Sequence, residues 1–129
     1  LSYLSLGKKE EAKLSFENAL RTRPGWVEAM VDYADLLIGM NKNKEAQDLL
    51  SQAQRLNAED INILNALGKL NLKRKDYAMA EQNYQAVLAK NSEDYRALTG
   101  MALVYEKQRK LLDSQMLFEK LENLILWTY

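Results

Sequence analysis

The sequence contains no cysteine and no histidine, and its 129 residues include a single proline, Pro24. The missing cysteine excludes disulfide bonds, thiolate zinc sites and cysteine nucleophiles, and the missing histidine excludes histidine-based catalytic triads. Carboxylates are the only plentiful acid–base groups, and neither a glycine-rich phosphate loop nor a metal-ligand pattern accompanies them. The sequence therefore predicts no enzymatic activity, no cofactor and no metal site.

A long hydrophobic run and an excess of charge of either sign are also missing. No apolar segment approaches the roughly 20 residues that a membrane-spanning helix needs, so we expect no membrane insertion. Lysine plus arginine and aspartate plus glutamate each count 18, and this balance gives no reason to expect a nucleic-acid partner. No signal pattern indicates a compartment.

What the sequence does contain is a repeat, in which the same pattern returns at every thirty-fourth position. A small residue recurs at this spacing, and a large apolar or aromatic residue follows it by four positions. The spacing of three or four within each half of the period predicts two amphipathic helices per period, joined as a helical hairpin. In the second helix of each hairpin the recurring positions are Ala12, Ala46, Ala80 and Ser114; Phe16, Leu50, Tyr84 and Phe118; and Ala19, Ala53, Val87 and Leu121. In the first helix they are Met30, Leu64 and Leu98; Tyr33, Leu67 and Met101; Ala34, Gly68 and Ala102; and Leu37, Asn71 and Tyr105.

The small residues predict close approach of neighbouring helices, with the large side chain filling the space beside them. Gly7 and Asn41 suit the left-handed conformation that ends a helix, and Asn57, Asp76 and Ser92 suit helix N-caps. Helices are expected at residues 8–22, 26–40, 43–56, 60–73, 77–90, 94–108 and 111–125, with a truncated helix before Gly7.

This pattern resembles the tetratricopeptide repeat (TPR), a 34-residue unit with a large residue, leucine, glycine and tyrosine on its first helix and alanine, phenylalanine and alanine on its second. Pro24 stands where that family places a proline after the second helix. The resemblance implies an all-α, right-handed superhelical solenoid of antiparallel hairpins. It divides residues 1–129 into a partial repeat and three complete repeats, and both ends suggest a fragment of a longer array. The partial repeat is 1–26, and the complete ones are 27–60, 61–94 and 95–128.

Helical spacing places a second set of residues on the exposed face of each first helix, which in this family lines a concave groove. The first of these helices contributes carboxylates and the next two contribute lysine, arginine and asparagine, with apolar side chains between them. We expect a partner peptide or helix of mixed charge to bind there. The predicted groove residues are Glu28, Val31, Asp32, Asp35 and Ile38; Asn62, Asn65, Lys69, Leu72 and Lys73; and Arg96, Thr99, Leu103 and Lys107.

Many relatives in chaperone adaptors hold a carboxylate terminus with lysine, asparagine and arginine side chains from three consecutive units. The corresponding positions here are Val31, Asp35, Ala66, Arg96 and Gly100. Only Arg96 fits, and Asp35 would repel a carboxylate. We therefore expect no binding of heat-shock chaperone tails.

The last residues form an apolar run, Leu124, Ile125, Leu126 and Trp127. The run either folds back on the last repeat or serves as a docking end for another repeat, a partner or a second copy of the chain.

The sequence favours a protein–protein interaction scaffold or adaptor. The alternatives are a regulatory or structural TPR segment of a larger enzyme or of a secretion or envelope-assembly machine, and an RNA-binding helical repeat. The three carboxylates of the first groove helix argue against RNA.

Overall fold

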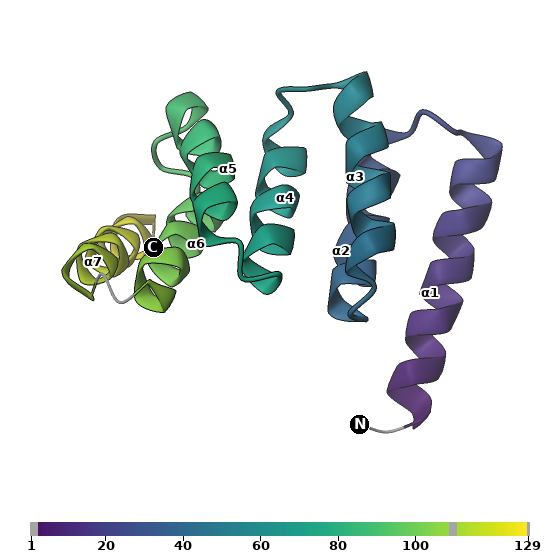
Figure 1. Cartoon of the computed structure of the whole chain (residues 1–129), viewed down its shortest axis with the longest axis horizontal. Helices are drawn as coiled ribbons and strands as arrows, with labels where there is room; N and C mark the ends of the chain where they lie inside the picture. The colour runs from purple at the N-terminus through teal and green to yellow at the C-terminus, as the bar shows by residue number, and fades with distance from the viewer. Residues whose placement is uncertain (1–2, 109–110, 129) are drawn as a thin grey trace. The chain divides into compact units, whose positions relative to one another are not determined.

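The chain forms helices joined by short loops. The computed structural model describes the backbone of residues 3–108 and 111–128 and the side chains of 7–108 and 115–126. No strand occurs in the described backbone, and its helices follow one another as in Figure 1: α1 (Tyr3–Thr22), α2 (Val27–Gly39), α3 (Asn43–Leu56), α4 (Ile61–Lys73), α5 (Tyr77–Lys90), α6 (Tyr95–Lys107) and α7 (Leu111–Thr128). This is the predicted all-helical arrangement.

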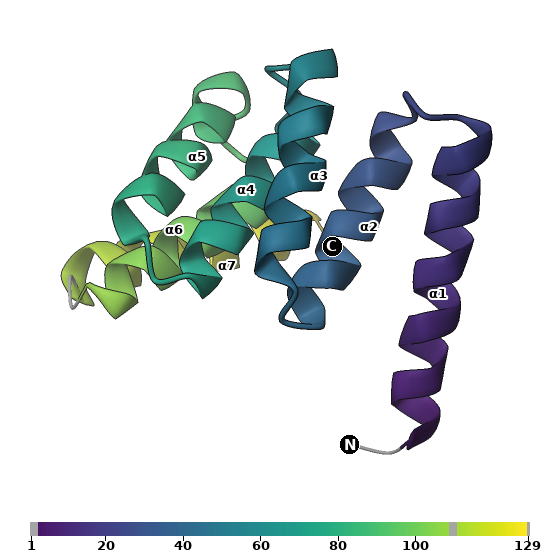
Figure 2. The ribbon, with the colours of Figure 1, turned by 45° about the vertical axis from the view of Figure 1, so that its right-hand side comes forward.

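The helices form two compact units, Leu1–Ile63 and Leu64–Tyr129, with the boundary in the first turn of α4. In the first unit, α2 packs against α1 and against α3. In the second unit, α6 packs against α5 and α7, and α4 contacts α5 through the side chains described below (Figure 2).

The core of the first unit consists of positions that recur once in every repeat. Ala46, Leu50 and Ala53 on α3 are 0% exposed, and Ala34 and Leu37 on α2 are 0% and 1% exposed. Because the alanines place only a methyl group between the helix backbones, α2 and α3 can lie close together.

An aromatic contact joins α1 to α2 in the same unit. The rings of Phe16 and Tyr33 stack with centroids 5.7 Å apart, and the Tyr33 hydroxyl donates to Glu17 Oε1 at 3.0 Å. Burial, reinforced by this bond to Glu17 and by its charge, raises the pKa of Tyr33 to about 12. Phe16 stays half-buried, so this contact is less enclosed than those between α2 and α3.

The second unit is built around the ring of Tyr84 on α5, which is 4% exposed. A Cβ atom added to Gly68 on α4 would lie 2.6 Å from Tyr84 Cζ, and one added to Gly100 on α6 would overlap the same ring. Tyr84 therefore lies between two helices that both carry glycine where the ring touches them. Burial raises the pKa of Tyr84 to about 12.

A hydrogen bond between two side-chain amides also connects α4 to α5. Asn71, 9% exposed, donates from Nδ2 to Asn83 Oδ1 at 2.8 Å. The sequence places Asn71 in the core register, and this bond shows how a polar residue is accommodated there: its donor is satisfied across the interface.

Two helices end in the left-handed conformation at equivalent positions of successive repeats. Asn41 has φ 62° and Lys75 has φ 65°. The next residue in each turn bonds back to the helix, Lys42 N to Leu37 O and Asp76 N to Asn71 O, both at 2.8 Å. Both turns are Schellman-type helix endings. The sequence predicts the ending at Asn41, whereas lysine rarely adopts the left-handed conformation that Lys75 has.

The N-caps follow the prediction in part. Asp76 caps α5, accepting from Met79 N at 3.3 Å. Asn57, predicted as an N-cap, instead follows the last residue of α3 as its C-cap. Ser92 is not the cap of α6 either, because Asp94 accepts from Ala97 N at 3.0 Å in that role. A cap must lie directly before the first helical residue, and Asn57 and Ser92 lie four and three positions before the first residues of α4 and α6.

The predicted break at Gly7 is wrong. Helix α1 runs from Tyr3 to Thr22 without interruption, and Gly7 does not have a positive φ. A glycine inside an exposed helix costs only about 1 kcal/mol relative to alanine, which is too little to end a helix by itself.

Candidate partner-binding surfaces

The predicted groove residues of the first unit lie along α2. Glu28, Asp32 and Asp35 are exposed, and Val31 is half-buried. Ile38 is 1% exposed, so it belongs to the core and is not available as an apolar contact for a partner. The accessible part of α2 is therefore a short acidic strip.

The corresponding face of α4 is basic. Lys69 and Lys73 are exposed, and Leu72 between them is half-buried. Asn62 is exposed at the start of the helix, where its backbone N–H donates to Asp60 Oδ1 at 2.7 Å. The two lysines lie one helical turn apart on the same side of α4.

The face of α6 is also basic. Arg96 has a 53% exposed side chain, Lys107 is exposed, and Thr99 is half-buried. Leu103, 37% exposed, lies between the two cations on this face. Within the second unit, α4 and α6 thus both present positive charge beside a leucine.

Asn65 is a predicted groove residue that the structure places inside the second unit. It is 6% exposed and donates from Nδ2 to Asp94 Oδ1 at 3.4 Å. Its own Oδ1 is buried without a hydrogen-bond partner among the described residues. Asn65 therefore connects α4 to the N-terminus of α6, and it is not accessible to a partner.

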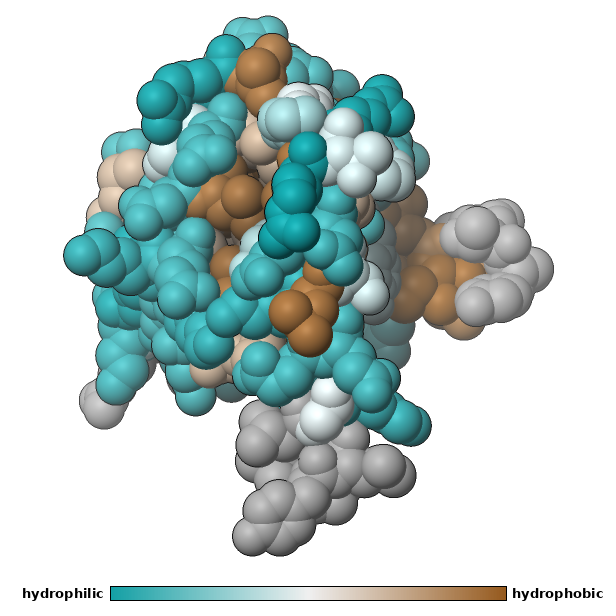
Figure 3. Space-filling view, turned by 90° about the vertical axis from the view of Figure 1, so that its right-hand side faces the viewer, coloured by the Kyte–Doolittle hydropathy of each residue, from teal (hydrophilic) through white to brown (hydrophobic). Residues whose placement is uncertain are grey.

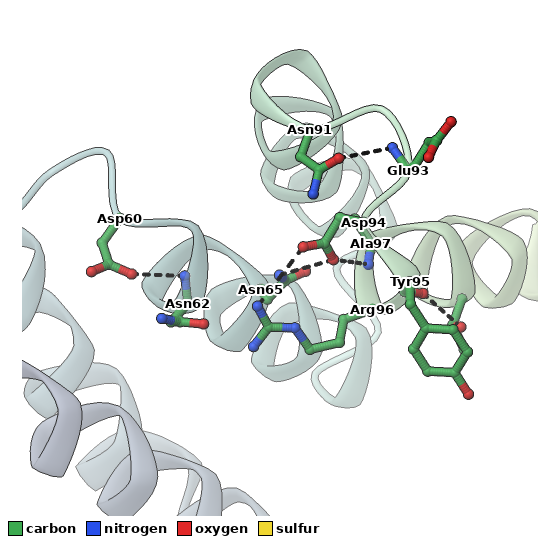
Figure 4. A network of polar contacts seen from close by, with 10 residues as sticks. Asp60, Asn62, Asn65, Asn91, Glu93, Asp94, Tyr95, Arg96 and Ala97 are labelled. Atoms are coloured by element: carbon green, nitrogen blue, oxygen red, sulfur yellow. Dashed lines mark hydrogen bonds and ion pairs between the residues drawn. The ribbon is translucent and has the colours of Figure 1, made fainter. Parts of the chain in front are cut away.

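Asp94 is the centre of this network (Figure 4). One carboxylate oxygen accepts from Asn65 and from Ala97 N, and the other lies 3.8 Å from Arg96 Nη2. Because Asp94 is 11% exposed and Arg96 is 53% exposed, the carboxylate anchors a guanidinium that remains open to solvent. The contact also neutralises part of the Arg96 charge.

Sequence reasoning missed Asp94 and its neighbour Tyr95, which is 59% exposed at the start of α6. The signal for Asp94 was present, because it stands three residues before the first buried residue of the helix, Ala97. Tyr95 gave no signal, since an exposed aromatic at a helix start has no periodic counterpart in this chain.

The predicted docking end is only partly exposed. On α7, Leu124 is half-buried, Ile125 is 42% exposed and Leu126 is 69% exposed. The side chain of Trp127 lies outside the described residues. The accessible apolar surface of this segment therefore comes from Ile125 and Leu126.

The predicted core positions of α7 are buried only in part. Leu121 is 6% exposed, as the register predicts, but Phe118 is 41% exposed. This departs from Leu50 and Tyr84, which occupy the same position of earlier repeats and are buried. The side chain of Ser114 lies outside the described residues.

Figure 3 looks on to the α1 side of the chain and shows a mostly hydrophilic surface with separate hydrophobic patches. Among the described residues no group of acidic side chains could hold a metal ion. No helix within the part that the structure describes is long and apolar enough to cross a membrane.

Comparison with protein families matches residues 3–70 to the tetratricopeptide repeat, and residues 65–114 to it again. The first match alone spans more than half of the chain, so the chain belongs to the tetratricopeptide repeat family. The paired helices, the 34-residue register and the small-against-large core are the features on which this membership rests.

Solved structures share the fold at low sequence identity. A MamA RS-1 double mutant superimposes with a TM-score of 0.77 at 16% identity, covering 97% of this chain and 70% of that one. Residues 41 to the end of MamA from Desulfovibrio magneticus RS-1 give a TM-score of 0.77 at 16% identity, covering 94% and 68%. A tetratricopeptide repeat protein from Parabacteroides merdae gives 0.73 at 20%, covering 95% and 49%. A comparison with curated proteins found no match.

These comparisons support an interaction scaffold in general terms. The tetratricopeptide fold is typically a non-catalytic module that binds other proteins.

Proposed function

We propose that the chain is a scaffold that binds an extended segment or a helix of a partner protein along the exposed faces of its first helices. The observation that carries the proposal is the basic face of the second unit, where Lys69, Lys73, Arg96 and Lys107 are exposed on α4 and α6. Leu72 and Leu103 lie among these cations and supply apolar contacts.

Charge favours a partner segment with acidic residues at the second unit. Four cations on two helices attract carboxylates, and the leucines beside them favour an apolar residue in the same segment. The acidic strip on α2 in the first unit, Glu28, Asp32 and Asp35, favours basic residues in a segment that binds to that unit.

Reversing two charges on α4 tests the proposal. We expect the double variant Lys69→Glu/Lys73→Glu to lose tenfold or more in affinity, because each reversal replaces attraction of an acidic segment by repulsion. The immobilised full chain first captures partners from a cell extract, and the captured protein is then titrated calorimetrically against wild type and variant.

The matched control is Lys8→Glu/Lys44→Glu, which makes the same change in net charge at exposed lysines on α1 and α3. We expect the control to bind like wild type. Equal affinity of both double variants, with circular dichroism showing both folded, would contradict binding on the α4 face.

A further inference from the structure

Tyr84 carries a hydroxyl group at a repeat position that is otherwise apolar. The residues at the same position of the other repeats are Phe16, Leu50 and Phe118. Tyr84 is 4% exposed, and phenylalanine would fill the same space. A buried tyrosine usually pairs its hydroxyl with another polar group, because an unpaired polar group away from water is destabilising.

The Tyr84 hydroxyl has no such partner within the described residues. It forms no hydrogen bond with them, and burial alone raises the pKa of Tyr84 to about 12. Nor is it one of their fully buried polar atoms that lack a partner. The small exposed part of Tyr84 therefore includes the hydroxyl, which keeps its proton at neutral pH and can donate it to a ligand.

The glycines beside the ring show where the hydroxyl reaches the surface. The far end of the ring, Cζ and both Cε atoms, lies against Gly68 on α4 and against Gly100 on α6. Cζ carries the hydroxyl, and the side chain starts from α5. The hydroxyl consequently points between α4 and α6, on the side away from α5.

Both glycines lie on the helix faces that are predicted to line the groove. Each has a predicted groove residue one turn before it and another one turn after it, and residues at this spacing share a face. These neighbours are Asn65 and Leu72 for Gly68, and Arg96 and Leu103 for Gly100. The hydroxyl therefore opens at the floor of the candidate groove of the second unit, at a point where α4 and α6 both lack a side chain.

We propose that the Tyr84 hydroxyl is a ligand-binding group of this groove and donates a hydrogen bond to the carboxylate of a glutamate in the partner segment. The inference rests on the proposed function, because it names the acidic residue that enters the second unit. Leu72 is half-buried and Leu103 is exposed, so both offer apolar surface to the methylene stem of the glutamate. The exposed Arg96 attracts its carboxylate. Aspartate is too short, since the hydroxyl lies below the surrounding side chains.

Tyr84→Phe tests the proposal, because it removes the hydroxyl and keeps the ring against both glycines. The probe is a fluorescently labelled, end-blocked peptide with two glutamates on each side of one leucine, titrated against the full chain by anisotropy. We expect Tyr84→Phe to bind it about tenfold more weakly or worse, because a hydrogen bond to a charged group is lost. A peptide with aspartate in place of every glutamate should also bind more weakly to the wild type.

The matched control is Tyr105→Phe on α6, which removes a hydroxyl that bonds to Glu81 within the protein. This control should bind the glutamate peptide like wild type. In protein labelled with ¹³C-tyrosine, the Cζ resonance of Tyr84 should shift in proportion to the bound fraction. Chemical unfolding should find Tyr84→Phe at least as stable as wild type, since the hydroxyl has no partner to lose.

The charge-reversal variant Lys69→Glu/Lys73→Glu separates this inference from the proposed function. If that variant loses the peptide and Tyr84→Phe does not, the inference is overturned and the proposed function stands. If only Tyr84→Phe loses the peptide, the hydroxyl contact is supported and binding on the α4 lysines is contradicted. The inference is also overturned if the wild type shows no saturable binding, if both peptides bind equally, if the Cζ resonance does not move, or if Tyr84→Phe is less stable.

Discussion

Residue size governs how closely the helices of the second unit approach one another. The Tyr84 ring touches Gly68 and Gly100, and neither position has room for a methyl group. The 34-residue register predicts that small residues face large ones, and the contact between Gly68 and the Tyr84 ring confirms it for the second unit. Burial follows the register at Ala46, Leu50, Ala80 and Tyr84, whereas Phe118 is 41% exposed. The sequence alone does not predict Gly100 as the second contact of Tyr84, because that contact lies between successive hairpins rather than within one.

Gly100→Ala should therefore destabilise the chain by about 1–3 kcal/mol, as overpacking of a core does. The matched control is Gly39→Ala in α2, where an added Cβ meets no atom within 4 Å. That control should be neutral or stabilising by up to about 1 kcal/mol, because alanine favours the helix. Chemical unfolding measures both variants, and equal stability of Gly100→Ala and wild type would show that the ring moves aside without cost.

Two residues predicted to lie on the binding surface are buried instead. Ile38 and Asn65 share the helical spacing of the exposed groove residues, yet they are 1% and 6% exposed. Their helical angle places them at the margin of the exposed face, where contact with a neighbouring helix decides burial. Periodicity in one helix carries no information on that neighbour.

At the scale of the element, helices were easier to predict than their ends. Six of the predicted helices agree with α2 to α7 within a few residues, because hydrophobic spacing is a property of the whole segment. The caps depend on which loop residue lies directly before the first turn. In the loop before α6, Ser92 and Asp94 both have capping side chains, and only the backbone geometry selects Asp94.

Asp94→Ala should destabilise the chain by about 0.5–2 kcal/mol, the usual loss for an N-cap. The substitution removes the acceptor for Ala97 N and for Asn65 Nδ2 together, so the loss should lie in the upper half of that range. Glu93→Ala, at the exposed neighbouring carboxylate, is the control and should change stability by less than about 0.5 kcal/mol. Thermal unfolding compares the melting temperatures of the two variants. Similar melting temperatures would contradict a stabilising role of Asp94 as the N-cap of α6.

At the scale of the whole molecule, the all-helical repeat fold is what the sequence predicted, and family membership confirms it. The right-handed superhelix, the repeat boundaries and a groove running along all first helices remain predictions implied by the resemblance. A repeat period specifies the contacts inside hairpins and between neighbours, whereas the curvature of an array depends on small rotations added over many units.

Stability in such an array is a sum over neighbouring units. Ala80→Leu and Ala46→Leu replace alanines that are 0% exposed on α5 and α3, and each should cost about 1–3 kcal/mol by overpacking. We expect Ala80→Leu to accelerate amide hydrogen exchange mainly in the second unit, and Ala46→Leu mainly in the first. Uniform acceleration across the chain in both variants would instead indicate one cooperative unit.

The double contact of Tyr84 has a consequence for how arrays of this kind can grow by gene duplication. Copying residues 61–94 in tandem would place Ala66, the counterpart of Gly100 one period earlier, against a tyrosine that tolerates no methyl group. The junction between the old and the new hairpin would then be overpacked. The lengthened protein would pack well only after the copied alanine changed to glycine, or after the tyrosine changed to a smaller residue.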